Sequence, residues 1–127
     1  MNKTILIAVY GTLRKGFSNH PYMSKASFIG KGKTKDLYTL TASGIPFVSK
    51  NPRVQVTVEI YELPMSELSF VDRLEGHPNF YCREEIDCIL DTKEQRKAWL
   101  YFCENVGNTL IETGDYSDYK KQLLNES

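Results

Sequence analysis

Glu75 is the residue with the clearest potential for chemistry, because its position opposes a rule of helix electrostatics. Residues 66–74 predict a short amphipathic helix, with Ser66 as its N-cap and with Gly76 and Pro78 ending it. Glu75 therefore falls at the negative end of the helix dipole, where a carboxylate is disfavoured by about 0.3–1 kcal/mol. This penalty raises the carboxyl pKa, and burial would raise it further. A carboxyl with a pKa near neutrality suits a general acid and base.

A turn near the N-terminus is the second candidate. The apolar run at residues 5–8 predicts a buried strand, and the turn after it contains Tyr10, Gly11, Thr12 and Leu13. Gly11 lacks a Cβ, so the backbone can bend tightly and a ligand can approach it. If the N–H groups of this turn face a cavity, they form a small nest that suits a carboxylate or an oxyanion.

Ordinary roles stay open for these polar residues. Most glutamates are solvated, and Glu75 taken alone fits that description. His20 and His77 have no third ligand at metal-site spacing, so we expect no metal. A nucleophilic pair of Cys82 with His77 is an alternative, although Cys82 lies in a predicted strand where core packing is the simpler role.

The composition predicts one small globular domain without a strong electrostatic field. The chain has 127 residues, which we assign to a single domain over residues 1–127. Its 16 basic and 16 acidic residues cancel, which argues against nucleic acid or a membrane surface as partner. No stretch has the length of a membrane span. Three cysteines without Cys-x-x-Cys spacing indicate reduced thiols in a cytoplasmic protein. The oligomeric state stays open.

Strand patterns dominate the chain. Residues 54–61 alternate between apolar and polar side chains and predict a half-buried strand, ended by Pro64. Residues 27–40 are also strand-like, and the glycines within them suggest bulges in a curled sheet. A turn is expected at residues 43–46. A hairpin is expected from residues 86–90 and 98–102, with Trp99 and Tyr101 on its other face.

Helical patterns are short. One is expected to open at His20 and Pro21, and the last covers residues 116–124 with Asp115 as its cap. With the helix before Glu75, this gives two or three short helices beside six or seven strands. The fold class is therefore α+β with a curled or closed sheet, a small mixed β-barrel.

Three segments resemble the signatures of the γ-glutamylcyclotransferase superfamily, in particular its γ-glutamylamine cyclotransferase and AIG2-like branch. Residues 9–16, VYGTLRKG, followed by Asn-His at 19–20, resemble the family's Tyr-Gly-Thr-Leu loop. Residues 71–83, VDRLEGHPNFYCR, resemble its second signature, in which Asp precedes Glu by three and Tyr-x-Arg follows. Residues 114–116 with Tyr119 are similar to its C-terminal aromatic motif. The order and spacing agree from about residue 5 to 119.

The resemblance implies a compact mixed barrel with a pocket between the Tyr-Gly-Thr-Leu loop and Glu75, and it implies that Glu75 is catalytic. The implied reaction needs no metal or cofactor. The α-amine of an L-γ-glutamyl group attacks its own γ-carbonyl, and 5-oxoproline and a free amine leave. Candidate substrate-binding residues are Tyr10, Gly11, Thr12, Leu13, Ile45, Pro46, Tyr81 and Tyr116. For the last four, ordinary core packing is the competing role.

Two other functions remain compatible with the sequence. One is a non-catalytic binding module for γ-glutamyl groups or other small molecules on the same fold, since a fold alone does not establish an activity. Glu75 argues against it, because a pure binder has little use for a carboxyl there. The other is a cyclotransferase for γ-glutamyl peptides, glutathione or another γ-glutamyl compound. The loops around Ile45 and the hairpin would decide between substrates.

Overall fold

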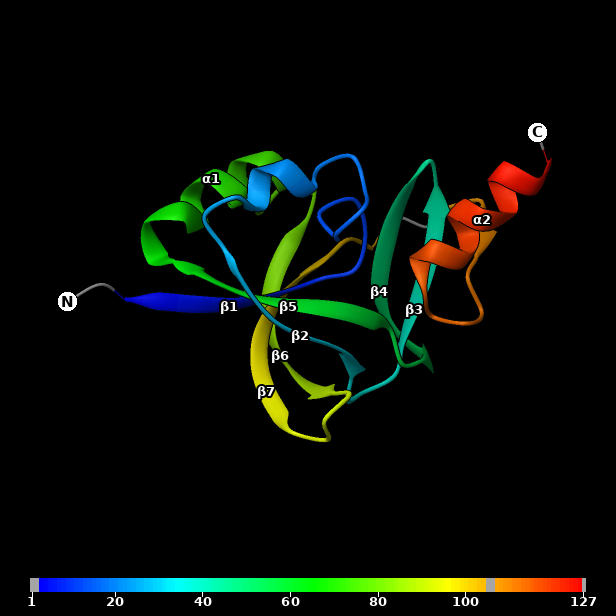
Figure 1. Cartoon of the computed structure of the whole chain (residues 1–127). Coiled ribbons are helices and arrows are strands. Elements are labelled where there is room, and N and C mark those ends of the chain that lie inside the picture. The colour runs from blue at the N-terminus through cyan, green and yellow to red at the C-terminus, as the bar shows by residue number, and fades with distance from the viewer. Residues whose placement is uncertain (1–2, 105–106, 127) are drawn as a thin grey trace.

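Five strands close into a barrel, and three others form a second sheet beside it (Figure 1). The structure, a computed structural model, describes residues 3–104 and 107–126. The barrel order is β1 (Thr4–Val9), β5 (Thr57–Pro64), β2 (Ser27–Thr34), β6 (Cys82–Leu90) and β7 (Gln95–Phe102). The second sheet has the order β4 (Ile45–Val54), β3 (Tyr38–Ser43) and β8 (Thr109–Leu110). The predicted α+β class with a mixed barrel is confirmed.

The barrel closes through one parallel contact, in which Ile7 of β1 pairs with Trp99 of β7. The other barrel pairs are antiparallel, and β6 and β7 form the expected hairpin. The register of β2 against β5 shifts between Phe28 and Gly30, so the bulge that the glycine pattern predicts is present. Apolar side chains from the barrel, β3, β4 and α2 (Tyr116–Glu126) form one core cluster, and a second cluster includes Met23 and Val71 from the helical segments that cover the barrel.

Two helical segments cover the barrel at the top of Figure 1, and α2 lies beyond the second sheet at its right. The 3₁₀ helix η1 (His20–Met23) opens where expected. Helix α1 (Met65–Glu75) buries Leu68 and Val71. Ser66 is not its N-cap: β5 runs directly into the helix, and extended Pro64 occupies the cap position.

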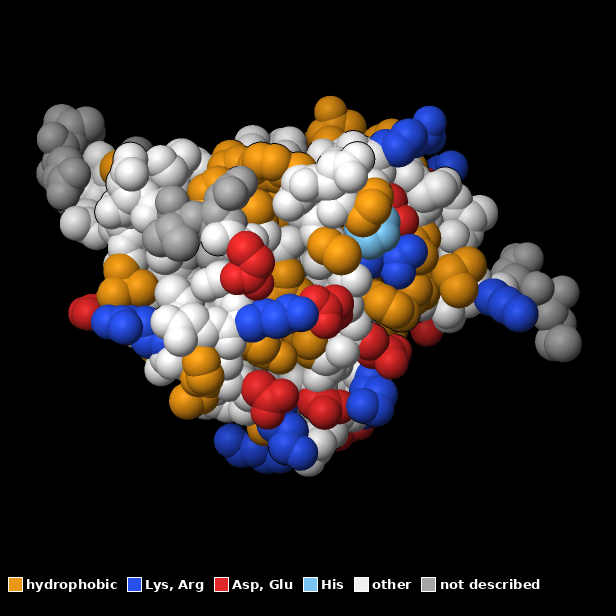
Figure 2. All heavy atoms as spheres, turned by 180° about the vertical axis from the view of Figure 1, so that it is seen from behind, with side chains coloured by type: hydrophobic (Ala, Val, Ile, Leu, Met, Phe, Trp, Pro, Cys, Tyr) orange, Lys and Arg blue, Asp and Glu red, His pale blue; other side chains and the backbone are white. Residues whose placement is uncertain are grey.

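Helix α2 begins after Asp115, as predicted. The Ser117 N–H donates to Asp115 Oδ1 at 2.9 Å, so the aspartate side chain caps the helix. No described helix is long and apolar enough to cross a membrane. In the rear view of Figure 2, acidic and basic side chains are interspersed, without a large area of one sign on that face.

Besides the N-cap of α1, three local expectations are wrong. Val54 belongs to β4, and β5 starts only at Thr57. The turn expected at residues 43–46 is shorter than predicted and consists of Gly44 alone. The positive φ of Gly44, 81°, reverses the chain, so that β4 starts at residue 45. Cys82 is exposed at the start of β6 and does not pack in the core. Among the described residues there are eight strands, since the region at 27–40 divides into two and neither β4 nor β8 was predicted.

The strand β5 also differs from the expected half-buried pattern. Its predicted polar face is buried as well: Glu59 is 7% exposed and Tyr61 is 4% exposed. Alternating polarity predicts solvent on one face only when no other element covers it. In this fold, the loop after β1 covers that face and supplies Arg14 as the partner of Glu59.

Candidate active site

A cavity of about 150 Å³ lies between the loop after β1, the β3–β4 hairpin and the end of α1. Its walls come from segments that are distant in sequence and that the fold brings together. The lining residues are Val9, Tyr10, Gly11, Thr12, Leu13, Asn19, Ile45, Pro46, Leu74, Glu75, Tyr81 and Tyr101. Glu75 is the one acidic or basic side chain among them, in the part of the chain that the structure describes.

Glu75 is the last residue of α1. Gly76 takes the left-handed conformation with φ of 72°, and its N–H donates to the Arg73 carbonyl, which ends the helix. Burial raises the pKa of the Glu75 carboxyl from 4.5 to about 7. The raised pKa was expected, and its cause in the structure is the desolvation of the buried carboxyl. At neutral pH this group is therefore present in both protonation states.

Tyrosine hydroxyls surround Glu75 but donate elsewhere. Tyr10 donates to the Tyr101 carbonyl at 2.6 Å, and Tyr81 donates to the Pro46 carbonyl at 2.7 Å. The Tyr101 hydroxyl donates to Asp72 Oδ1 at 2.6 Å. Among the described residues, none forms a hydrogen bond or an ion pair with the Glu75 carboxyl, so both its oxygens are available to a ligand.

Asp72 connects the end of α1 to the β6–β7 hairpin. Its two oxygens accept hydrogen bonds from Arg83 Nε at 2.9 Å and Nη2 at 3.2 Å. The Arg83 guanidinium also lies over the Trp99 ring, 4.8 Å from its centroid. Burial opposes ionisation of Asp72, but the bonds from Arg83 and Tyr101 outweigh it and lower its pKa. This anionic group fixes Tyr101 beside Glu75.

The loop after β1 lines the same cavity and carries backbone N–H groups without a partner among the described residues. The Arg14 N–H donates to the Gly11 carbonyl at 3.0 Å and closes a turn. The N–H groups of Gly11, Thr12 and Leu13 form no hydrogen bond with another described residue. Such unpaired, adjacent donors suit a carboxylate or an oxyanion.

Asn19 and His20 hold this turn in place. The Asn19 backbone N–H donates to the Thr12 carbonyl, and its side-chain Nδ2 donates to Thr12 Oγ1, both at 2.9 Å. The ring Nδ1 of His20 lies 3.0 Å from the Leu13 carbonyl. The turn is thus tied at two successive residues, which orients its N–H groups before a ligand binds.

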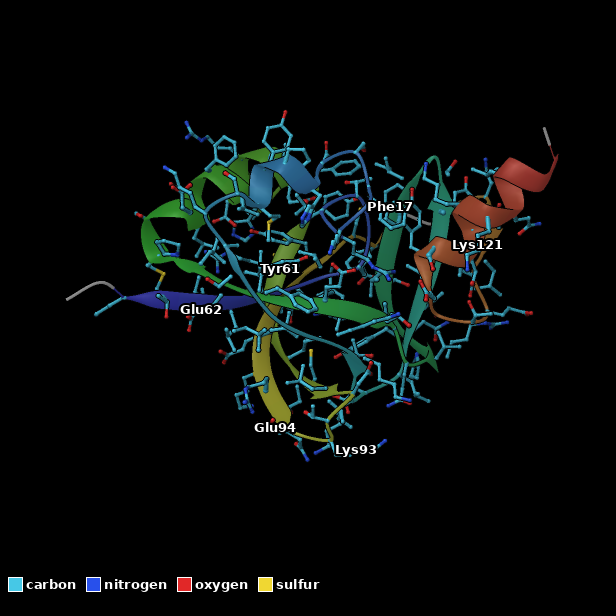
Figure 3. The ribbon with its side chains drawn as sticks, in the orientation of Figure 1. Phe17, Tyr61, Glu62, Lys93, Glu94 and Lys121 are labelled. Atoms are coloured by element: carbon cyan, nitrogen blue, oxygen red, sulfur yellow. The ribbon has the colours of Figure 1, made fainter. Side chains whose placement is uncertain are left out.

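A buried ion cluster anchors the end of the turn. Arg14, which is 4% exposed, places Nε 3.2 Å from Glu59 Oε2 and Nη1 2.8 Å from Asp115 Oδ1. Glu59 Oε1 accepts the Lys15 N–H at 2.9 Å and the Tyr61 hydroxyl at 2.8 Å. Tyr61 lies on β5 where this strand passes β2 (Figure 3). The cluster joins the loop, the barrel and the N-terminus of α2.

Residues 7–118 match the family described as gamma-glutamyl cyclotransferase, AIG2-like. The chain belongs to this family. The expected family, its barrel fold and the enzyme class are therefore confirmed.

Individual members of the γ-glutamyl cyclotransferase family show the extent of the likeness. A Methanocaldococcus jannaschii protein named as a candidate γ-glutamylcyclotransferase is 46% identical over 116 residues, covering 90% of this chain and 97% of that protein. The γ-glutamylaminecyclotransferase A of Danio rerio is 37% identical over 109 residues, covering 76% and 68%. The crystal structure of an AIG2-like protein from Mus musculus aligns with a TM-score of 0.77 at 28% identity, covering 88% of each chain.

The cavity of this family member brings together most of the residues that the sequence nominates. Glu75 and seven candidate binding residues line it: Tyr10, Gly11, Thr12, Leu13, Ile45, Pro46 and Tyr81. Tyr116 does not line it; its side chain is fully buried, and its hydroxyl donates to the Gly44 carbonyl at 2.9 Å. Four further lining residues were not predicted from the sequence: Val9, Asn19, Leu74 and Tyr101. The Asn-His of the first signature was a usable signal for Asn19.

The alternative nucleophilic pair is not formed. His77 Nδ1 accepts the Arg83 N–H at 3.2 Å, and no hydrogen bond joins His77 to Cys82 among the described residues. His20 instead binds the Leu13 carbonyl through Nδ1, and its ring centroid lies 5.9 Å from that of Tyr61. Within residues 3–104 and 107–126, no three His, Cys, Asp or Glu side chains gather as metal ligands do.

Gly11 is required because Pro46 packs directly on it. A Cβ at position 11 would overlap Pro46 Cγ and lie 3.2 Å from Cδ. We expect Gly11→Ala to lower the free energy of unfolding by about 1–3 kcal/mol, the usual cost of overpacking, and to lower kcat/KM as the N–H groups move. Urea unfolding and 5-oxoproline release measure both effects. The Gly11→Ala/Pro46→Ala double variant should regain part of the stability, and a double variant no more stable than Gly11→Ala would contradict this explanation.

Proposed function

We propose that the chain is a γ-glutamylamine cyclotransferase, which releases 5-oxoproline and a free amine from an L-γ-glutamyl amide. The observation that supports this most is the Glu75 carboxyl with a pKa of about 7, without a hydrogen-bonding partner, in a cavity shared with unpaired backbone donors. The name of the Danio rerio relative agrees with this substrate class.

Glu75 acts in both proton transfers of the proposed mechanism. A free α-amine has a pKa of about 8 and is mostly protonated at neutral pH. The Glu75 carboxylate accepts its proton, the amine nitrogen bonds to the γ-carbonyl carbon, and a five-membered ring forms. The neutral Glu75 carboxyl then donates this proton to the departing nitrogen as the C–N bond breaks, and the regenerated carboxylate takes the second proton from the ring nitrogen. That second proton ends on the released amine, which leaves as ammonium, so both protons that the α-ammonium group loses are accounted for without a covalent intermediate.

The turn at residues 10–13 binds charge in this mechanism. Its N–H groups hold the substrate α-carboxylate or the oxyanion that develops on the γ-carbonyl oxygen. Preorganised donors of this kind stabilise a transition state by about 3–4 kcal/mol. Tyr81 and Pro46 close the cavity around the folded γ-glutamyl chain, which brings the amine close to the carbonyl.

We further propose that the chain acts in the cytoplasm as one domain over residues 1–127, without metal or cofactor. Its three cysteines are free, as reduced thiols require. Cys88 is buried, which raises its thiol pKa to about 12 and makes it a poor nucleophile. Every proton and bond of the proposed reaction is accounted for by Glu75 and the substrate.

The deciding experiment measures 5-oxoproline release from γ-glutamyl-ε-lysine, simple γ-glutamylamines, γ-glutamyl dipeptides and glutathione. We expect turnover of the amines by the wild type. Turnover of dipeptides or glutathione alone would instead favour a peptide cyclotransferase. Binding of γ-glutamyl compounds without turnover of any of them would favour the non-catalytic module.

The rate should depend on pH through Glu75. Because its pKa in the free enzyme is raised to about 7, the carboxylate that acts as base is lost as the pH falls through 7. We expect kcat/KM to fall on the acidic side with an apparent pKa near 7. The exposed Glu85 provides a control, since Glu85→Gln should leave this limb in place. An acidic limb at about 4.3, the usual glutamate value, would contradict the role of burial.

A further inference from the structure

The tip of the β3–β4 hairpin forms one wall of the cavity and is held by α2. Gly44 makes the turn, and Ile45 and Pro46 follow it into the cavity wall. The Tyr116 hydroxyl donates to the Gly44 carbonyl at 2.9 Å, and the Gly44 N–H donates to the Tyr119 hydroxyl at 3.1 Å. Figure 1 shows this tip between the loop after β1 and α2.

The two tyrosines form a rigid support. Tyr116 is fully buried, and its ring stacks on that of Tyr119 with centroids 5.7 Å apart. The ring of Phe17, which is labelled in Figure 3, also packs on Tyr116, with the ring centroids 5.5 Å apart. Tyr81 binds the Pro46 carbonyl. The peptide group before Ile45 and the carbonyl of Pro46 are therefore each held by a tyrosine hydroxyl, which limits the movement of residue 45 in the wall.

The exposed part of the cavity lining is apolar. Ile45 is 43% exposed and Leu74 is 38% exposed, whereas most other lining side chains are buried. These two residues come from the hairpin and from α1, so they border the cavity from two elements. Among the described residues, no lysine or arginine lines the cavity.

We propose that Ile45 and Leu74 are the specificity-determining residues for the leaving amine, and that Tyr116 and Tyr119 are positioning residues for Ile45. This inference rests on the proposed function. The polar donors and Glu75 serve the γ-glutamyl group, so the substituent on the departing nitrogen meets the exposed apolar border. An alkyl substituent gains burial there. A carboxylate beside that nitrogen loses water and meets no cation.

The test compares two substrates that differ only in a carboxylate, γ-glutamyl-propylamide and γ-glutamyl-2-aminobutyrate. The wild type should prefer the propylamide. Ile45→Lys places a cation at the border and should raise the kcat/KM ratio of aminobutyrate over propylamide about fivefold, the gain for two charges about 4 Å apart in water. Leu37→Lys is the matched control, because Leu37 is exposed and does not line the cavity. It should leave the ratio unchanged.

The positioning role has its own readout. Tyr116→Phe removes the hydroxyl that fixes Gly44 while it keeps the ring in the core. For γ-glutamyl-propylamide, we expect KM to rise by a larger factor than kcat falls. The ratio of kcat/KM for γ-glutamyl-propylamide over γ-glutamyl-methylamide should also become smaller. A loss of stability alone would lower activity on both amides equally, and that result would overturn the positioning role.

The outcome also separates this inference from the proposed function. An unchanged substrate ratio in an active Ile45→Lys enzyme would overturn the role of Ile45 and leave the cyclotransferase activity standing. If the wild type released no 5-oxoproline, the proposed function would fail. Calorimetry would then measure the affinities of γ-glutamyl-propylamide and γ-glutamyl-2-aminobutyrate for the wild type and for Ile45→Lys. If the ratio of the two affinities were the same in both proteins, the role of Ile45 would be refuted.

Discussion

Glu75→Gln is expected to lower kcat for 5-oxoproline release by about 10²–10⁴-fold, the usual contribution of a general acid and base. Glutamine has nearly the size of glutamate but can neither accept the α-ammonium proton nor donate one to the departing nitrogen. Since no described residue donates to the Glu75 carboxyl, the substitution breaks no hydrogen bond that holds the fold. The measurement is steady-state turnover of a γ-glutamylamine.

The same variant should be more stable than the wild type at alkaline pH. The folded-state pKa of Glu75 is raised from 4.5 to about 7, so ionisation opposes folding. The penalty is absent below pH 4.5, grows as the pH rises, and is complete above 7, where the shift corresponds to ~3 kcal/mol. Urea unfolding at pH 8 should therefore show a stabilised Glu75→Gln.

Glu85→Gln is the control for both effects, because Glu85 is exposed on β6 and does not line the cavity. It should change neither turnover nor its pH dependence. A Glu75→Gln enzyme that keeps most of its activity would sink the mechanism. If Glu75→Gln were inactive but no more stable than the wild type at pH 8, the catalytic role of Glu75 would stand and its raised pKa would be contradicted.

The sequence alone could predict the two halves of the cavity because each is a contiguous segment. The turn at residues 10–13 follows from an apolar run that ends at glycine, and the position of Glu75 follows from helix periodicity and Gly76. The β6–β7 hairpin and the cap of α2 were predictable for the same reason. In each case the deciding interactions lie within a few residues of one another.

The interactions that complete the site join distant positions, which local patterns cannot reveal. Tyr101 binds Asp72 across 29 residues, and Arg14 binds Asp115 across 101. The polarity of Glu59 predicted a solvent-facing position, but its charge is instead matched by Arg14 inside the protein. Gly11 was attributed to a ligand's approach, whereas the structure also shows Pro46 occupying that space.

The buried Arg14 cluster gives the second large prediction. Arg14→Met is expected to lower the free energy of unfolding at pH 7 by about 3–5 kcal/mol, because two carboxylates then remain inside the protein without their cation. Methionine fills much of the same volume, so the loss reports charge more than packing. Urea unfolding measures it. Arg96→Met is the control: Arg96 pairs with Glu94 at the surface, and its loss should cost less than about 1 kcal/mol.

The pH dependence identifies the charge that Arg14 stabilises. Burial opposes ionisation of Asp115, but the hydrogen bonds from Arg14 and Ser117 outweigh it and lower its pKa to about 2. A lowered carboxyl pKa stabilises the fold above the unfolded value of about 3.9, and this contribution is lost as the pH falls towards 2. The difference in stability between the wild type and Arg14→Met should therefore shrink between pH 4 and pH 2. If this difference in the free energy of unfolding stayed constant over the range, Arg14 would act through packing. The loop with the backbone donors would then be held by van der Waals contacts rather than by ion pairs.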